Sequence, residues 1–220
     1  MLLSLKFIFN YFIMLELNKI HLWDCLELMQ QIPDKSIDLV LTDPPYWIWY
    51  GGSMKLWTEK FWWKQYETWR DESRPSKEYF DEIFRISKNQ IIRWGNYFID
   101  YLEPKMCRLV RDKWQRDFSL ADWELARTSF DKALRICTVP RAEALQDWKE
   151  HPTQKSLRLF KWCLENHSEP WMTILDPFLW SWTTAVACKQ MWRNFIGIEK
   201  EKKYVDIANK RLQYTQVALF

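Results

Sequence analysis

The sequence contains very little glycine. It has 4 glycines and 16 tryptophans among 220 residues, whereas the average usage of roughly 7% would give about 15 glycines in a chain of this length. Its 5 cysteines include no C-x-x-C pair, so neither a zinc site nor a dithiol redox site is indicated. Because the cysteine count is odd and no small-residue cleavage site follows the first apolar stretch, we expect reduced thiols in a cytoplasmic protein rather than a secreted disulfide scaffold.

The chain also lacks an apolar run long enough to cross a membrane. The most apolar stretch, residues 1–14, reads MLLSLKFIFNYFIM and includes Lys6 and Asn10. We interpret residues 1–13 as an accessory or non-native extension, with the true start at Met14. A packed extra helix and a membrane contact are the alternatives. The net charge of +3 is too small to indicate a nucleic-acid partner on its own.

Residues 14–220 suffice for a single domain, and their pattern alternates between strands and helices. Short apolar, β-branched runs predict strands over 37–42, 90–92, 173–175 and 195–198. Helical spacing and start signals predict helices over 75–88, 152–166, 183–191 and 202–213. This alternation is typical of an α/β fold with a parallel sheet. The least regular stretches, 47–74 and 101–150, are the candidate substrate-recognition loops.

The sharpest motif, Asp43-Pro44-Pro45-Tyr46, follows the first of these strands. It suits methylation of an exocyclic amine, whose lone pair is delocalised into the ring of the base. A carboxylate and a backbone carbonyl that accept the two N–H bonds would pull the nitrogen toward tetrahedral geometry. Prolines keep the turn rigid, and an aromatic ring gives a flipped base a surface to stack on. We therefore identify these four residues as catalytic candidates; taken alone, the motif could also be an ordinary strand-to-loop turn.

A second loop, DPFL from Asp176, follows a later strand and leads through Ser181 to Thr183 and Thr184 at a helix start. Polar groups and a helix N-terminus at the carboxyl end of a parallel strand form a nucleotide-sized site. Glu199 ends the next strand, where an acid suits ribose hydroxyls. Two further polar segments, HPTQKS from position 151 and DCLE from position 24, lie at the starts of other predicted helices.

In this order, the motifs resemble those of the site-specific DNA adenine-N6 methyltransferases, within the DNA N4/N6 amino-methyltransferases whose catalytic DPPY motif precedes the cofactor motif. The resemblance runs from about Met14 to Leu212. It implies a Rossmann-like α/β fold with a seven-stranded, mostly parallel sheet, S-adenosylmethionine as cofactor and no metal. It also implies direct in-line methyl transfer to the N6 amine of an adenine flipped out of double-stranded DNA.

The resemblance assigns cofactor binding to loop and polar residues: Asp24, Thr153, Gln154, Lys155, Asp176, Pro177, Phe178, Ser181, Thr183, Thr184 and Glu199. Asp rather than Ser at position 43 favours adenine N6 over cytosine N4. Cytosine N4 methylation remains the alternative activity, and a catalytically inactive DNA-binding homologue is the alternative from another class. The expected partner is double-stranded DNA and not a membrane; a homodimer and a cognate restriction nuclease on another chain stay open.

The chain departs from the family pattern at its glycines. The family reads DPF-x-G-S-G-T-T where this sequence has Trp180 and Trp182, and those glycines allow close approach of backbone to ligand. Other tryptophans also stand where such sequences carry glycine: Trp23, Trp47, Trp49, Trp94, Trp114, Trp123, Trp171 and Trp192. Conversely, arginine stands at four positions where such sequences often carry tryptophan: Arg93, Arg108, Arg111 and Arg127.

We interpret this exchange as a decoding error. A codon that the source organism reads as glycine was rendered tryptophan, and arginine codons that it reads as tryptophan were rendered arginine. A decayed gene copy is the alternative. Replacing four arginines by neutral residues would turn the small positive charge negative, so the mild basicity is no evidence for DNA. We expect the literal chain, with indole rings in its cofactor loop, to bind S-adenosylmethionine poorly.

Overall fold

The computed structural model describes residues 14–45, 74–116, 121–140, 143, 155–179 and 182–216. The strands are β1 (Lys19–Leu22), β2 (Ile37–Thr42), β3 (Ser87–Arg93), β4 (Arg108–Asp112), β5 (Trp123–Thr128), β6 (Arg135–Thr138), β7 (Thr173–Asp176) and β8 (Asn194–Glu199). The helices are α1 (Cys25–Met29), α3 (Lys77–Ile86), the 3-10 helix η1 (Gly95–Tyr97), α5 (Leu157–His167), α6 (Thr183–Gln190) and α7 (Lys202–Tyr214).

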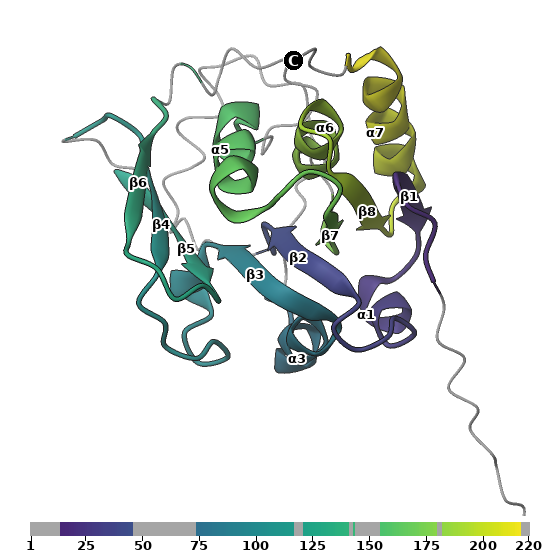
Figure 1. Cartoon of the computed structure of the whole chain (residues 1–220), viewed down its shortest axis with the longest axis horizontal. Coiled ribbons are helices and arrows are strands. Elements are labelled where there is room, and N and C mark those ends of the chain that lie inside the picture. Colours follow the sequence, from purple (N-terminus) through teal and green to yellow (C-terminus); the bar gives the residue numbers. More distant parts are fainter. Residues whose placement is uncertain are drawn as a thin grey trace, which may run out of the picture.

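The strands form one sheet in the order β1-β8-β7-β2-β3-β5-β4-β6. Neighbouring strands run parallel from β1 to β3, β5 is antiparallel to both of its neighbours, and β6 is parallel to β4. Helices α5, α6 and α7 lie over one face and α1 and α3 over the other (Figure 1). The mostly parallel, helix-covered sheet predicted from the sequence is therefore confirmed.

The central strands are apolar along their whole length because both faces of the sheet are covered. In β2, Leu39 and Leu41 belong to the core cluster shared with α5 and α6, whereas Val40 belongs to the cluster shared with α1 and α3. Ile91 and Ile92 of β3 divide between the two clusters in the same way. Successive side chains of a strand point to opposite faces, so a continuous apolar run fills two separate cores.

The predicted helices and strands lie within a few residues of the observed ones, but the sheet is wider than expected. It has eight strands, one more than the resemblance implied. Residues 101–150, interpreted as an irregular recognition loop, contribute β4, β5 and β6 to it. The described part of this segment is thus integral to the sheet, and most of the other candidate loop, 47–74, lies outside the described residues.

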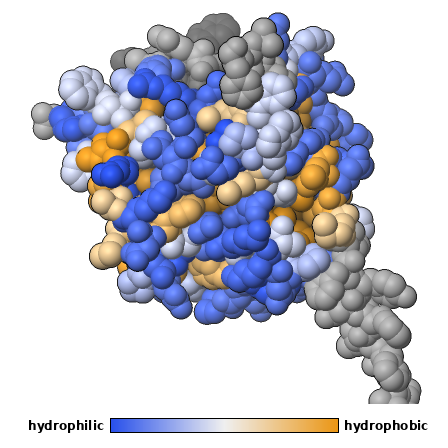
Figure 2. Space-filling model, in the orientation of Figure 1, coloured by the Kyte–Doolittle hydropathy of each residue, from blue (hydrophilic) through white to orange (hydrophobic). Residues whose placement is uncertain are grey.

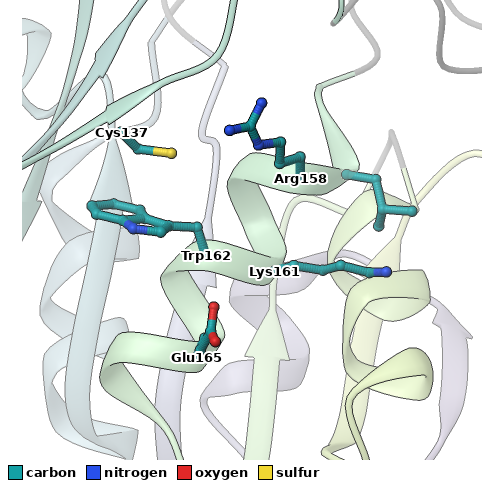
Figure 3. Close-up of a pocket in the computed structure, with 6 residues that line it drawn as sticks. Cys137, Arg158, Lys161, Trp162 and Glu165 are labelled. Atoms are coloured by element: carbon teal, nitrogen blue, oxygen red, sulfur yellow. The ribbon is translucent and has the colours of Figure 1, made fainter. Parts of the chain in front are cut away.

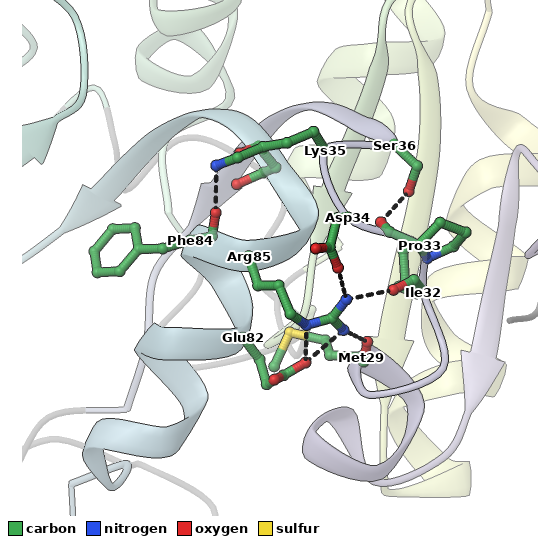
Figure 4. A network of polar contacts seen from close by, with 10 residues as sticks. Met29, Ile32, Pro33, Asp34, Lys35, Ser36, Glu82, Phe84 and Arg85 are labelled. Carbon is green, nitrogen blue, oxygen red and sulfur yellow. Dashed lines mark hydrogen bonds and ion pairs between the residues drawn. The ribbon is translucent and has the colours of Figure 1, made fainter. Parts of the chain in front are cut away.

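Arg85 of α3 joins that helix to the turn between α1 and β2 (Figure 4). Its guanidinium donates hydrogen bonds to the carbonyls of Ile32 at 2.9 Å and Met29 at 2.8 Å. It also pairs with Asp34 at 2.5 Å and with Glu82 at 2.6 Å. One side chain therefore satisfies carbonyls left at the end of a short helix and fixes where β2, which leads to the DPPY motif, begins.

Replacing Arg85 by methionine is expected to lower the free energy of unfolding by about 1–3 kcal/mol, because two carbonyls lose a charged donor. Urea denaturation measures the change. Arg158→Met is the matched control, since Arg158 is exposed and pairs with Glu143, and such surface pairs contribute ~0–1 kcal/mol. Equal losses in the two variants would contradict the role given to Arg85.

Hydrophilic residues cover most of the face seen in Figure 2, with hydrophobic residues in small groups between them. Exposed apolar side chains on β5 and β6 include Trp123 and Ile136. Within the described ranges, no helix combines the length and apolar character needed to cross a lipid bilayer.

Candidate active site

The site lies where the direction of chain winding changes. From β2 the chain passes through α3 to β3 on one side, and from β7 it passes through α6 to β8 on the other. β2 and β7 are adjacent and parallel, so Asp43, which follows β2, and Asp176, which ends β7, meet at the same edge. Ligands of open α/β sheets bind outside the carboxyl ends of the strands at such a switch point.

Asp176 braces this edge. Its Oδ1 accepts hydrogen bonds from the Thr42 hydroxyl at 2.7 Å and the Phe178 amide at 3.1 Å, and its Oδ2 accepts one from the Thr184 hydroxyl at 2.5 Å. The carboxyl group thus ties β2, the DPFL loop and the start of α6 together. Burial raises the pKa of Asp176 to about 6, against the lowering effect of these hydrogen bonds and with a further increase from Asp43.

Stability is expected to fall with rising pH because of this carboxyl group. The pKa of Asp176 is higher in the folded chain, about 6, than in the unfolded chain, so its stabilising contribution is complete in acid and is lost as the pH rises through that value. Glu199, whose pKa burial raises to about 7, acts in the same direction.

Asp176→Asn keeps an acceptor for Thr42 and Phe178 and cannot ionise, so this variant should lose less stability than the parent between pH 5 and 7.5. Urea unfolding over a pH series measures the free energy of unfolding of both proteins. The histidines titrate equally in the two, so their contribution drops out of the difference. Identical slopes would show that Asp176 does not ionise in this range.

Asp43 faces buried cations. Its Oδ2 lies 2.9 Å from the Nζ of Lys155, and its Oδ1 lies 3.6 Å from the Nε of Arg93. Arg93 also pairs with Glu124 of β5, which Lys113 approaches at 3.3 Å. Burial alone would raise the pKa of Glu124, but the positive charges around it, first that of Arg93, lower this pKa to about 2. The sequence pattern assigned Lys155 to the cofactor; the structure gives it a direct contact with the catalytic candidate.

The cofactor candidates gather at the same edge from neighbouring strands. Glu199 ends β8, beside Leu22 at the end of β1, and its Oε1 accepts the amide of Glu201 at 2.8 Å. Asp24 caps α1, with its Oδ1 accepting the amides of Leu26 at 2.9 Å and Glu27 at 3.3 Å. Acids at the ends of β8 and β1 are the groups that suit the hydroxyls of a ribose, so the side chains present fit a nucleoside.

The remaining candidates divide between described and undescribed residues. Thr183 and Thr184 begin α6, where the Thr183 hydroxyl donates to the Lys155 carbonyl at 3.4 Å. Phe178 packs its ring 5.8 Å from that of Tyr79. Pro44, Pro45 and Pro177 continue the loops after β2 and β7. Four candidates lie outside the described residues: Tyr46, Thr153, Gln154 and Ser181.

The cysteines supply no nucleophile. All five are buried and free, and burial raises the pKa of Cys25 and of Cys163 to about 12. Such thiols stay protonated at neutral pH, whereas the thiolate is the reactive form. A covalent cysteine intermediate, as used in methylation of a cytosine ring carbon, is therefore not supported by these side chains.

A shallow surface hollow lies between β6 and α5, lined by Cys137, Leu157, Arg158, Lys161, Trp162 and Glu165 (Figure 3). None of the catalytic or cofactor candidates that the structure describes lines it. Arg158, at its edge, pairs with Glu143 at 2.7 Å. The hollow is thus separate from the edge where Asp43 and Asp176 meet.

Sequence comparison identifies the family. Residues 60–210 match the family model of the N6/N4 DNA methylases, described as DNA methylase. The chain belongs to this family of DNA methyltransferases. The type II methyltransferase M.HinfI of Haemophilus influenzae is 27% identical over 246 aligned positions, which cover 90% of this chain and 68% of that protein.

Solved structures agree with this assignment. The complex of M1.HpyAVI with S-adenosylmethionine superposes with a TM-score of 0.57 at 26% identity, covering 88% of this chain and 98% of that one. The cytosine-N4-specific PvuII DNA methyltransferase shares the fold, with a TM-score of 0.61 at 15% identity and coverage of 90% and 87%. The cofactor of the family is S-adenosylmethionine.

Proposed function

We propose that the protein methylates the exocyclic N6 amine of adenine at a specific sequence in double-stranded DNA, and that it does so in the cytoplasm. The observation that carries the proposal is the convergence of Asp43 and Asp176 at the switch point, bridged by the 2.7 Å hydrogen bond from Thr42 to Asp176. One carboxylate belongs to the motif suited to the amine and the other to the loop suited to the nucleoside. Bound S-adenosylmethionine supplies an electrophilic methyl group.

The residues of the chain orient the base. Asp43 and the Pro44 carbonyl accept the two N–H bonds of the target amine, which pulls the nitrogen toward tetrahedral geometry and frees its lone pair from conjugation with the ring. Tyr46 stacks on the flipped base. Lys155, 2.9 Å from Asp43, is a positioning residue that holds the side chain of Asp43 at the edge of the sheet. Burial of Asp43, which is 2% exposed, excludes water from the amine.

Both the N6 amine of adenine and the N4 amine of cytosine are compatible with this chemistry, and Asp43 favours adenine. The alternative is cytosine N4, supported by the shared fold of the PvuII enzyme. The test is nucleoside analysis of DNA incubated with S-adenosylmethionine and the Trp180→Gly, Trp182→Gly variant. N6-methyladenine supports the proposal. N4-methylcytosine would establish the alternative, and no methylated base from a variant that binds the cofactor would refute both.

A further inference from the structure

Tryptophan occupies most of the left-handed positions of the backbone. Outside glycine, seven described residues have positive φ, and five of them are tryptophan: Trp94 at 52°, Trp114 at 53°, Trp171 at 68°, Trp182 at 45° and Trp192 at 61°. This region suits glycine and tolerates asparagine, whereas a bulky side chain there is a true outlier. All five positions belong to the set at which the sequence pattern asks for glycine.

Two of these positions lie in turns whose geometry specifies glycine. Trp171 follows Pro170 in a turn closed by the hydrogen bond from the Met172 amide to the Glu169 carbonyl at 3.3 Å. Proline followed by a residue of positive φ is the pattern of a type II turn, which places glycine at the second central position. The backbone therefore has the form of a Pro-Gly turn.

The end of α6 gives the second case. The amide of Arg193 donates to the carbonyl of Cys188 at 3.0 Å, and Trp192 between them has positive φ. This is the hydrogen bond of a Schellman motif, in which the residue after the C-cap is usually glycine. Trp192 stands at that residue, two positions after the last residue of α6.

Trp182 is the N-cap of α6, with φ 45° and ψ −1° and no side-chain capping bond. Its ring is fully buried, and its indole N–H, a donor, has no hydrogen-bond partner among the residues that the structure describes. Such buried donors are nearly always satisfied in folded proteins. Glycine at this position would cap the helix without strain and leave no buried donor.

The arginines show the reverse mismatch. Arg108 of β4 and Arg127 of β5 lie directly opposite each other in the antiparallel ladder, where like charges destabilise pairing. In the described part of the chain, each has a buried Nη1 without a hydrogen-bond partner. Burial, and then the charge of Arg108, lower the pKa of Arg127. A neutral aromatic pair suits this position better, because cross-strand aromatic pairs stabilise sheets.

We propose that the protein made by the source organism carries glycine at positions 94, 114, 171, 182 and 192, and tryptophan at 108 and 127, because its translation machinery reads those codons differently. The positive φ angles support glycine at the five positions, and the opposed guanidinium groups support tryptophan at 108 and 127. Trp162 of α5 and Trp123 of β5 have no positive φ, so the backbone conformation does not require glycine at either position. The inference does not depend on the proposed choice of adenine.

The decisive experiment is peptide mass spectrometry of the protein purified from the cells in which its gene is native. Trypsin cleaves after arginine, so tryptophan at positions 108 and 127 removes two cleavage sites as well as changing the masses. We expect peptides with glycine at 171 and 192 and no cleavage after 108 or 127. Peptides that carry tryptophan at 171 and 192 would overturn the proposal.

A second test uses the exposed positions, where removing a ring leaves no cavity. Trp114 is 73% exposed and Trp171 is 66% exposed, and both have positive φ; Trp123 is 57% exposed within a strand. At 114 and 171 the glycine variant should have a higher Tm than the alanine variant, because alanine keeps a Cβ. At 123 the order should reverse, because glycine weakens a strand. The same order at all three positions would contradict the backbone argument.

Discussion

The variant Trp180→Gly, Trp182→Gly is expected to bind S-adenosylmethionine about 10- to 100-fold more tightly than the chain as written, since overpacking costs ~1–3 kcal/mol and each ~1.4 kcal/mol is tenfold in affinity. Trp182 is the N-cap of α6, with φ 45°, and it follows the loop that Asp176 braces. Glycine there lets the backbone approach a ligand. Isothermal titration calorimetry measures both dissociation constants.

The matched control is Trp180→Ala, Trp182→Ala, which removes both rings but keeps a Cβ on a left-handed residue. It should bind the cofactor more weakly than the glycine variant. Thermal unfolding of all three proteins checks that each is folded, because loss of the buried Trp182 ring leaves a cavity that costs up to ~5 kcal/mol. A folded glycine variant that does not bind would show that the cofactor site is wrongly assigned.

Asp43→Asn, introduced into the glycine variant, is expected to slow methyl transfer by about 100- to 1000-fold, the range seen when a single preorganised polar group is removed from an active site. The amide keeps the shape of the side chain but not the charge that accepts the N–H bond of the amine. Cofactor affinity should change less than the transfer rate, because the cofactor candidates Asp176 and Glu199 lie at the ends of β7 and β8 rather than after β2. Transfer of a labelled methyl group to DNA, with calorimetry alongside, separates the two effects.

Asp38→Asn is the control on the same strand. Asp38 accepts the Thr173 amide at 2.9 Å and pairs with Lys88 at 2.7 Å, at the start of β2 rather than at its catalytic end. This variant should lose some stability while keeping its transfer rate. If Asp38→Asn slowed transfer as much as Asp43→Asn, a general weakening of β2 would explain both results. That outcome would contradict the catalytic role proposed for Asp43.

Local patterns predicted the elements that are regular in sequence. The apolar run of β2 and the helical spacing of α3 and α7 each reflect the buried side of their own element, so they were predicted near their observed bounds. β4 and β5 were missed because arginines stand at buried positions in them: Arg111 and Arg127 are 7% and 5% exposed. If those positions carry tryptophan, the apolar signal that identifies a strand was absent from the sequence as written.

The site was predictable only in part for a similar reason. Parallel strands bring their carboxyl ends to one edge, so the meeting of Asp43 with Asp176 followed from their places after strands. The contact of Asp43 with Lys155 depends on where the segment before α5 lies, and that of Thr42 with Asp176 depends on the order of the strands in the sheet. No local pattern encodes that order. For Asp176, the motif indicated a ligand contact, and the structure shows three internal hydrogen bonds.

The bond between Thr42 and Asp176 joins residues separated by 134 positions, and this separation constrains when the site can form. During synthesis β2 emerges early, but its neighbour β7 follows only after most of the chain has left the ribosome. Pairing over such a distance is slow because loop closure precedes any gain in contacts. The proposed catalytic centre is therefore among the last parts of the molecule to be completed, and a chain truncated before β7 would contain the DPPY motif after β2, paired with β3 on one side but lacking β7 on the other.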